Sequence, residues 1–160
     1  MPRAFIAIGS NLQQPRIQVN RAFELLASLP QTRLVKRSSL YRTAPIGYDN
    51  QPDFINAVAE IETELEPQQL LKELLALESQ QGRERPFPNA PRVLDLDLLL
   101  YNNTMMQTSE LTLPHPRMHV RGFVMLPLAE IAPDIEILGQ GKATALAAQC
   151  QGQGVEKLAN

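Results

Sequence analysis

The chain has 160 residues, a formal net charge of −2 at pH 7 and 44 % hydrophobic residues, which is the size and composition of one soluble globular domain. This charge excludes a global basic field that would recruit nucleic acid, and no apolar run approaches the ~20 residues that cross a bilayer. The single cysteine, Cys150, excludes an internal disulfide and a cysteine-based zinc site. We expect a cytoplasmic monomer without a nucleic-acid or membrane partner.

The first part of the chain predicts a strand, a helix and two further strands. Residues 4–8 form a short apolar run that ends at Gly-Ser-Asn, and apolar residues then recur at helical spacing over 15–29. Residues 34–41 contain the β-branched and aromatic types of a strand. Residues 54–63 alternate, with the aliphatic residues 55, 57, 59 and 61 on one face and Phe54, Asn56 and Val58 on the other. The segment 43–53, dense in Pro, Gly, Asn and Asp, predicts a long loop.

The middle of the chain predicts a helix, a second long loop and a strand. Pro67 opens a leucine-rich helical stripe, for which Gly82 is a good terminator. The proline-rich segment 83–92 is typical neither of a helix nor of a central strand, so it predicts a loop. The run VLDLDLLLY, residues 93–101, predicts a strand, and LPHPRMHVRG, residues 113–122, predicts another loop.

The order of these elements predicts the fold class. Residues 123–131 are apolar enough for a core helix or strand, and the tail after about residue 139 is weakly patterned. Strand, helix, strand, strand, helix, strand is the split βαβ pattern of a ferredoxin-like α+β domain with an antiparallel sheet. We therefore expect a single domain over residues 1–160.

Two aspartates within the strand 93–101 are the first candidates for chemistry. Asp95 and Asp97 lie two positions apart and point to one face, while Leu94, Leu96 and Leu98 face the core. Like charges so placed repel unless a cation lies between them, and Mg²⁺ is typically held by one or two carboxylates together with substrate phosphates. The alternative is a solvent-facing strand with alternating charge.

Cations cluster in the two loops on either side of this strand. Arg92 lies three residues before Asp95, and the other arginines are Arg83, Arg85, Arg117 and Arg121, with His115 and His119 in the second loop. Guanidinium groups suit a polyphosphate held beside a metal, although each of these residues taken singly is typical of a solvated surface. The sequence contains neither a P-loop nor a dinucleotide-binding glycine motif.

The strand 54–63 offers complementary chemistry at its start. Phe54 and Asn56 share a face directly after the first long loop. A flat heteroaromatic ligand could stack on the phenyl ring while the amide reads its hydrogen-bonding edge. The alternative is an ordinary core phenylalanine and a turn-capping asparagine.

Six segments in order cover nearly the whole chain to about residue 131: IAIGSNL, SSLYRTAPIG, QPDFINAV, ESQQGRER, APRVLDLDLLLY and LPHPRMHVRGFVMLPL. Together they resemble the 6-hydroxymethyl-7,8-dihydropterin pyrophosphokinase family of folate synthesis. The resemblance implies a ferredoxin-like α/β/α sandwich, with helices on both faces of the sheet. It also implies transfer of the pyrophosphoryl group of ATP to the pterin hydroxymethyl oxygen, with release of AMP.

The resemblance also implies roles for individual residues. Asp95 and Asp97 match a pair that binds two Mg²⁺ ions, and these aspartates with Arg83 and Arg92 would be catalytic. The nucleotide would contact Glu78, Arg83, Arg85, Arg92, Thr112, His115 and Arg121. The pterin would lie among Thr43, Pro45, Phe54, Asn56 and Phe123, with the two phenyl rings sandwiching it.

The chain departs from the family pattern in two places. Pro88-Asn89-Ala90 stands where relatives often carry a basic residue and a tryptophan, and Glu110 stands where some carry an arginine. Two other functions remain open from the residues alone. One is a different metal-dependent nucleotidyltransferase, which would release pyrophosphate, and the other is a non-catalytic ferredoxin-like binding module.

Overall fold

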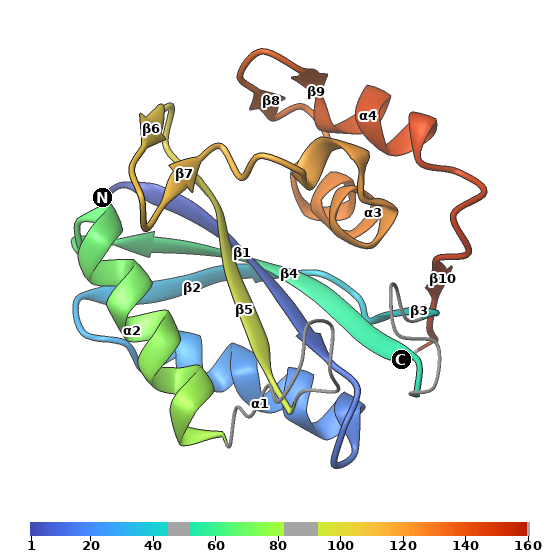
Figure 1. The fold of residues 1–160 in the computed structure, drawn as a ribbon, viewed down its shortest axis with the longest axis horizontal. Helices are drawn as coiled ribbons and strands as arrows, with labels where there is room; N and C mark the ends of the chain where they lie inside the picture. Colours follow the sequence, from blue (N-terminus) through green and yellow to red (C-terminus); the bar gives the residue numbers. More distant parts are fainter. Residues whose placement is uncertain (45–51, 82–92, 160) are drawn as a thin grey trace.

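A computed structural model of the chain describes residues 1–44, 52–81 and 93–159. A six-stranded sheet lies between two helical layers (Figure 1). Helices α1 (Pro15–Ala27) and α2 (Pro67–Gln80) cover one face, and α3 (Gly122–Ile131) and α4 (Ala143–Gln149) cover the other. The fold is therefore the predicted α+β, ferredoxin-like sandwich.

The sheet has the strand order β10-β3-β4-β1-β5, with β2 also paired to β4, and all these pairings are antiparallel. Its strands are β1 (Arg3–Ser10), β2 (Thr32–Arg37), β3 (Tyr41–Thr43), β4 (Phe54–Thr63), β5 (Asp95–Tyr101) and β10 (Glu156–Lys157). Two small ribbons lie outside it, formed by β6 (Met106–Gln107) with β7 (Thr112–Leu113) and by β8 (Glu136–Ile137) with β9 (Gly141–Lys142). A short 3₁₀ helix, η1 (Met118–Val120), precedes α3.

The predicted alternation of β4 is confirmed, and in the structure it divides the side chains of this strand between two cores. Ile55 and Ala57 pack with α1 and α2, whereas Val58 packs with α3 and α4. Because side chains alternate across a strand, a single strand can contribute to apolar layers on both faces of the sheet. Each helical layer thus has its own core, and the central strands are covered on both sides.

The strand predicted over residues 34–41 is two strands, β2 and β3, and the single-strand prediction is wrong. The Ser38 hydroxyl accepts a hydrogen bond from the Val58 N–H at 2.9 Å, and the Ser38 N–H donates to the Val58 carbonyl at 2.9 Å. A side-chain oxygen therefore takes the place of a backbone carbonyl in the ladder. Regular pairing stops at this point and resumes at Tyr41.

The segment 123–131, which the sequence left open between helix and strand, forms α3. Its buried residues Val124, Leu128 and Ile131 recur at helical spacing and pack into the second core. The chain after residue 139, whose pattern is weak, forms β9, α4 and β10. Among the described residues, no helix is both long enough and apolar enough to cross a membrane.

Candidate active site

One row of residues crosses the sheet near the end of β1. Asp95 on β5 pairs with Gly9 on β1, and Gly9 pairs with Asn56 on β4. The neighbouring row contains Asp97 and Ala7. Because paired residues on adjacent strands project to the same face, both carboxylates and the Asn56 amide lie on one face of the sheet.

The carboxylates of Asp95 and Asp97 lie outside the apolar core. Leu96 and Leu98 are buried in the core beneath α1 and α2, whereas the two aspartates are half-buried and line a cavity. The predicted alternation of β5 is confirmed. Because these carboxylates are exposed to the cavity, they avoid the desolvation penalty of complete burial in an apolar interior.

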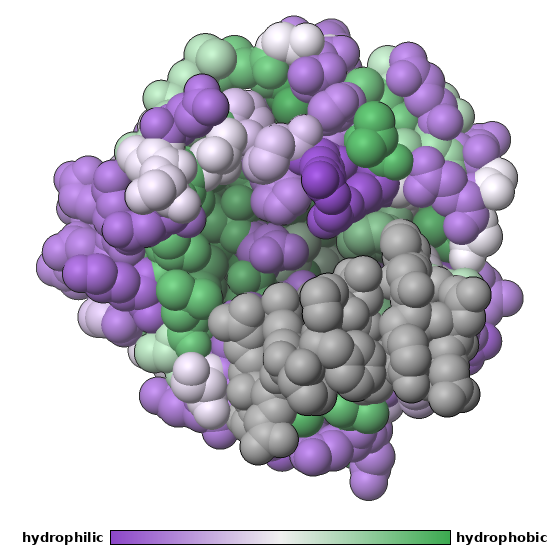
Figure 2. Space-filling view, in the orientation of Figure 1, coloured by the Kyte–Doolittle hydropathy of each residue, from purple (hydrophilic) through white to green (hydrophobic). Residues whose placement is uncertain are grey.

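A first cavity of about 530 Å³ opens on this face. Its lining includes Thr43, Phe54, Asn56, Asp95, Asp97, His115, Arg121 and Phe123, together with Gly9 and Arg117. Figure 2 shows a hollow in the middle of this view, with hydrophobic side chains toward its floor and strongly hydrophilic ones along its upper rim. A hydroxyl from β3, aromatic and amide groups from β4, carboxylates from β5 and cationic and aromatic groups from the start of α3 therefore line one cavity.

A second cavity adjoins the first. It is lined by Glu78 and leucines of α2, by β5, and by residues 108–112, which include Thr112. Asp95, Asp97 and His115 line both cavities. The two carboxylates therefore lie at the boundary between a cavity that contains aromatic and amide groups and one that contains leucines and hydroxyls.

The Asn56 amide is held in a defined position. Asn56 is buried, and its Nδ2 donates to Thr43 Oγ1 at 3.0 Å. A Cβ atom placed on Gly9 would lie 3.2 Å from Asn56 Oδ1, so the absence of a side chain at this position leaves the amide oxygen uncrowded. Gly9 was not singled out in the sequence, where its place before Ser-Asn indicated only the end of a strand.

Glu78 connects α2 to β5. Its side chain is buried, and Oε2 accepts a hydrogen bond from the Leu96 N–H at 2.7 Å, between the two aspartates in sequence. A carboxylate that accepts a backbone N–H forms a charge-assisted hydrogen bond. Glu78 thus orients β5, and it also lines the second cavity, where a nucleotide contact was predicted.

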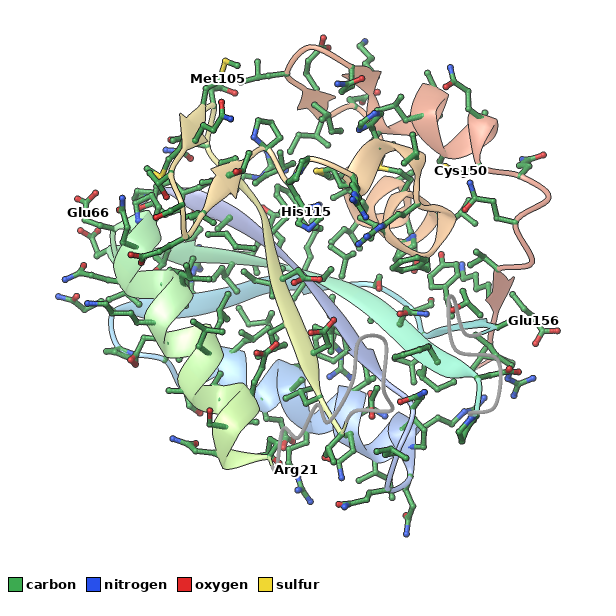
Figure 3. The ribbon with its side chains drawn as sticks, viewed as in Figure 1. Arg21, Glu66, Met105, His115, Cys150 and Glu156 are labelled. Carbon is green, nitrogen blue, oxygen red and sulfur yellow. The ribbon has the colours of Figure 1, made fainter. Side chains whose placement is uncertain are left out.

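His115 faces both cavities from the segment before η1 (Figure 3). Its backbone N–H donates to the Leu99 carbonyl at 2.9 Å. Its ring Nδ1 accepts the backbone N–H of Arg117 at 3.2 Å, which leaves the proton of the neutral ring on Nε2. Burial lowers the pKa of His115, and the charges of Arg121 and Arg117 lower it further, against the opposing effect of Asp95.

Arg121 and Phe123 come from the start of α3. The Arg121 guanidinium lies 5.7 Å from the centroid of the Phe123 ring, within the range of a cation–π contact. Both side chains line the first cavity. A cation and an aromatic ring therefore reach this cavity from one helix terminus, and Phe54 reaches it from the sheet.

The structure brings together all the predicted site residues that it describes. Eight of them line the first cavity, and Glu78 and Thr112 line the second. Pro45, Arg83, Arg85 and Arg92 lie outside the described residues. Arg117, which the sequence grouped with other arginines without assigning it a role, also lines the first cavity.

The carboxylate pair fits a hard divalent cation. Asp95 and Asp97 offer oxygen ligands on one face of a strand, beside a cavity large enough for a substrate. Within residues 1–44, 52–81 and 93–159, no group of three or more His, Cys, Asp or Glu side chains could hold a metal ion. A pair of this kind suits Mg²⁺, which commonly completes its coordination with water and substrate phosphates.

Comparison with known proteins identifies the family. A family model described as 7,8-dihydro-6-hydroxymethylpterin-pyrophosphokinase matches residues 5–133. The chain belongs to this family. It is 50 % identical over 135 residues to the 2-amino-4-hydroxy-6-hydroxymethyldihydropteridine pyrophosphokinase of Haemophilus influenzae. The aligned residues cover 84 % of each chain. It is 42 % identical over 156 residues to the enzyme of that name from Pseudomonas aeruginosa, covering 98 % of this chain and 96 % of the other.

Solved structures support the same fold. A structure described as a Plasmodium falciparum HPPK-DHPS triple mutant superposes with a TM-score of 0.74 at 14 % identity. The match covers 92 % of this chain and 44 % of the solved chain, so this chain spans less than half the length of that protein. At such low identity, the likeness shows the fold of the family and nothing further.

Proposed function

We infer that the protein transfers the pyrophosphoryl group of ATP to 6-hydroxymethyl-7,8-dihydropterin in folate biosynthesis. The products are the pterin diphosphate and AMP. The observation that carries the site assignment is that Asp95, Asp97 and His115 line both of two adjoining cavities. A two-substrate transfer requires such a boundary, because the acceptor oxygen and the β-phosphorus must meet between the two ligands.

The first cavity is assigned to the pterin. Phe54 and Phe123 would stack on the two faces of the bicyclic ring, and Asn56 would read its hydrogen-bonding edge. The hydrogen bond from Asn56 to Thr43 supports this role, because it orients the amide before the substrate binds. Pro45, which completes the predicted pterin set, lies outside the described residues.

The second cavity is assigned to the nucleotide. Leu71 and Leu75 on α2 would contact the base, with Thr112 beside it. The phosphates would extend toward His115 and Arg121, where Nε2–H and the guanidinium can donate to their oxygens. Arg83, Arg85 and Arg92 would complete the phosphate contacts, and they too lie outside the described residues.

Asp95 and Asp97 would hold two Mg²⁺ ions between these ligands. Bound Mg²⁺ would offset the charge of the triphosphate and polarise its β-phosphoryl group. The residues of the chain would align the two substrates. The pterin hydroxymethyl oxygen then attacks the β-phosphorus and gives up its proton, the bond to the α,β-bridging oxygen breaks, and AMP leaves. We propose that the protein acts as a cytoplasmic monomer, with the two small molecules as its partners.

A product assay tests the reaction class. The protein is incubated with ATP, Mg²⁺ and the reduced hydroxymethylpterin, and the nucleotide products are separated by chromatography. We expect AMP in a one-to-one ratio with the pterin diphosphate. Release of pyrophosphate would instead identify a nucleotidyltransferase, and binding without turnover would identify a non-catalytic module.

A further inference from the structure

The segment from Cys150 to Leu158, here called the C-terminal segment, runs from the end of α4 to the edge of the sheet. Figure 3 marks Cys150 beside the α3–α4 layer and Glu156 on β10. The family match ends at residue 133, well before this segment. The segment nevertheless contacts two elements that line the first cavity, the start of α3 and strand β3.

Gln153 contacts the backbone at the start of α3 through both polar atoms of its amide. Its Oε1 accepts the Gly122 N–H at 2.8 Å, and its Nε2 donates to the Val120 carbonyl at 2.9 Å. These two backbone groups flank Arg121, and Phe123 follows directly. One side-chain amide thus holds the backbone that presents both side chains to the cavity.

Close packing accompanies these hydrogen bonds. A Cβ atom placed on Gly122 would lie 3.1 Å from both Gln153 Oε1 and Val155 Cγ2, and 3.4 Å from Cys150 Cβ. Gly152 and Gly154, on either side of Gln153, have φ values of +91° and +75°, a region that favours glycine. The turn is therefore shaped so that Gln153 points back to the helix.

The other end of the C-terminal segment holds β3. Glu156 and Lys157 of β10 pair with β3, and the Glu156 carboxylate lies 3.1 Å from the Arg42 guanidinium. The Leu158 N–H donates to the Leu40 carbonyl at 2.9 Å. Strand β3 ends at Thr43, the residue that receives the Asn56 hydrogen bond inside the first cavity.

We propose that Gln153 is a positioning residue for the first cavity. The C-terminal segment would fix the positions of Phe123 and Thr43 relative to each other in the lining of this cavity. The proposal rests on the assignment of the first cavity to the pterin. The second cavity receives no lining from residues 118–123 or from the C-terminal segment. Gln153 would act on the nucleotide only through Arg121, which is one of several proposed phosphate contacts, so loss of the Gln153 contacts should affect the pterin more than the nucleotide.

Calorimetry on three variants of the full-length chain tests this proposal. Gln153→Met keeps the length of the side chain but removes both hydrogen bonds, whereas Gln153→Glu keeps only the acceptor for the Gly122 N–H. Gln151→Met makes the same chemical change two residues earlier in the same turn, and both glutamines are exposed, so the two variants differ in the contacts to residues 120 and 122. With a non-hydrolysable ATP analogue present, we expect the pterin dissociation constant of Gln153→Met to rise about tenfold, as for two lost hydrogen bonds.

The proposal predicts an order of pterin affinities among the three variants. The pterin affinity of Gln153→Glu should lie between those of the wild type and Gln153→Met, and that of Gln151→Met should match the wild type. The affinity for the ATP analogue should fall less than the pterin affinity, because Arg121 is one of several proposed phosphate contacts. Equal pterin affinities for Gln153→Met and Gln151→Met would overturn the proposal. Phe123→Ala is measured in parallel: unchanged pterin affinity in that variant would overturn the pocket assignment itself.

Discussion

Gly9 and Asn56 lie side by side on paired strands, and a Cβ atom on Gly9 would be 3.2 Å from Asn56 Oδ1. This separation is tighter than ordinary van der Waals contact, so any side chain at Gly9 must displace the amide or enter the cavity. The same backbone position pairs with Asp95 on its other side. The gap left by Gly9 therefore lies between the proposed pterin-reading amide and the proposed metal ligands.

Gly9→Ala should weaken pterin binding without loss of the fold. We expect the pterin dissociation constant to rise by about tenfold, because overpacking typically costs 1–3 kcal/mol and the new methyl group competes directly with the amide. ATP binding should stay near the wild-type value. Calorimetry with each ligand checks the prediction, and a wild-type pterin affinity would show that the amide oxygen has room to move.

Asn56→Ala should also impair pterin binding selectively. The substitution removes the amide and leaves Thr43 Oγ1 without the hydrogen bond that it now accepts at 3.0 Å. A loss of about tenfold or more in pterin affinity is expected from an unmade polar contact in a buried site. Thr43→Val keeps the shape and removes only the acceptor, so its effect should be smaller. Equal losses for pterin and ATP would contradict the assignment of the first cavity.

Asp97→Ala should abolish turnover and leave the fold intact. Removal of one carboxylate relieves repulsion within the Asp95–Asp97 pair, so the melting temperature should not fall. Turnover should drop by at least about a hundredfold, as when a single group that stabilises transition-state charge is deleted. Chelation of Mg²⁺ by EDTA should have the same effect on the wild type. Steady-state rates with and without added Mg²⁺ are the measurement, and retained turnover in Asp97→Ala would refute the metal role.

Ser10→Ala should destabilise the region that leads into β5. Ser10 is fully buried, and its hydroxyl donates to the carbonyl of Val93, two residues before Asp95. The variant leaves this carbonyl unsatisfied, which should lower the free energy of unfolding by about 1–3 kcal/mol. Ser28→Ala is the control, since its hydroxyl is exposed at the end of α1 and its loss should cost no more than about 0.5 kcal/mol. Urea unfolding compares the two, and equal stabilities would argue against this bond.

The pKa of His115, lowered below its ordinary value of 6.5, predicts a pH dependence of stability. Between the folded pKa and 6.5, the unfolded chain binds a proton that the folded protein does not, so stability rises with pH through this window and levels off above it. His115→Gln should remove this component. The unfolding free energies of the wild type and His115→Gln are measured from about pH 5 to 8 in EDTA. The wild type should lose more stability on acidification, so the two values should approach each other at the acid end. Parallel curves would exclude His115 as the source.

Several local features could be predicted from the sequence because they depend on neighbours along the chain. The alternation of β4 and β5 follows from the two-residue repeat of a strand, and it places Asp95 and Asp97 on one face whatever the partner strands are. The start of α2 at Pro67 follows from the fixed φ of proline, which suits a first helical turn. The interruption at Ser38 was missed, because it depends on a hydrogen bond to Val58 on another strand.

The sequence alone thus determined the periodic elements, the class of chemistry and most of the residues assigned to the two ligands. Only the tertiary structure decided that Asp95, Asp97 and His115 border both cavities, because this depends on how β1 lies between β4 and β5. Only the tertiary structure likewise shows that Gln153, in a weakly patterned segment, hydrogen-bonds to the backbone at the start of α3. Side-chain contacts between segments distant in sequence leave no periodic trace along the chain, since they are created by packing and not by local conformational preference.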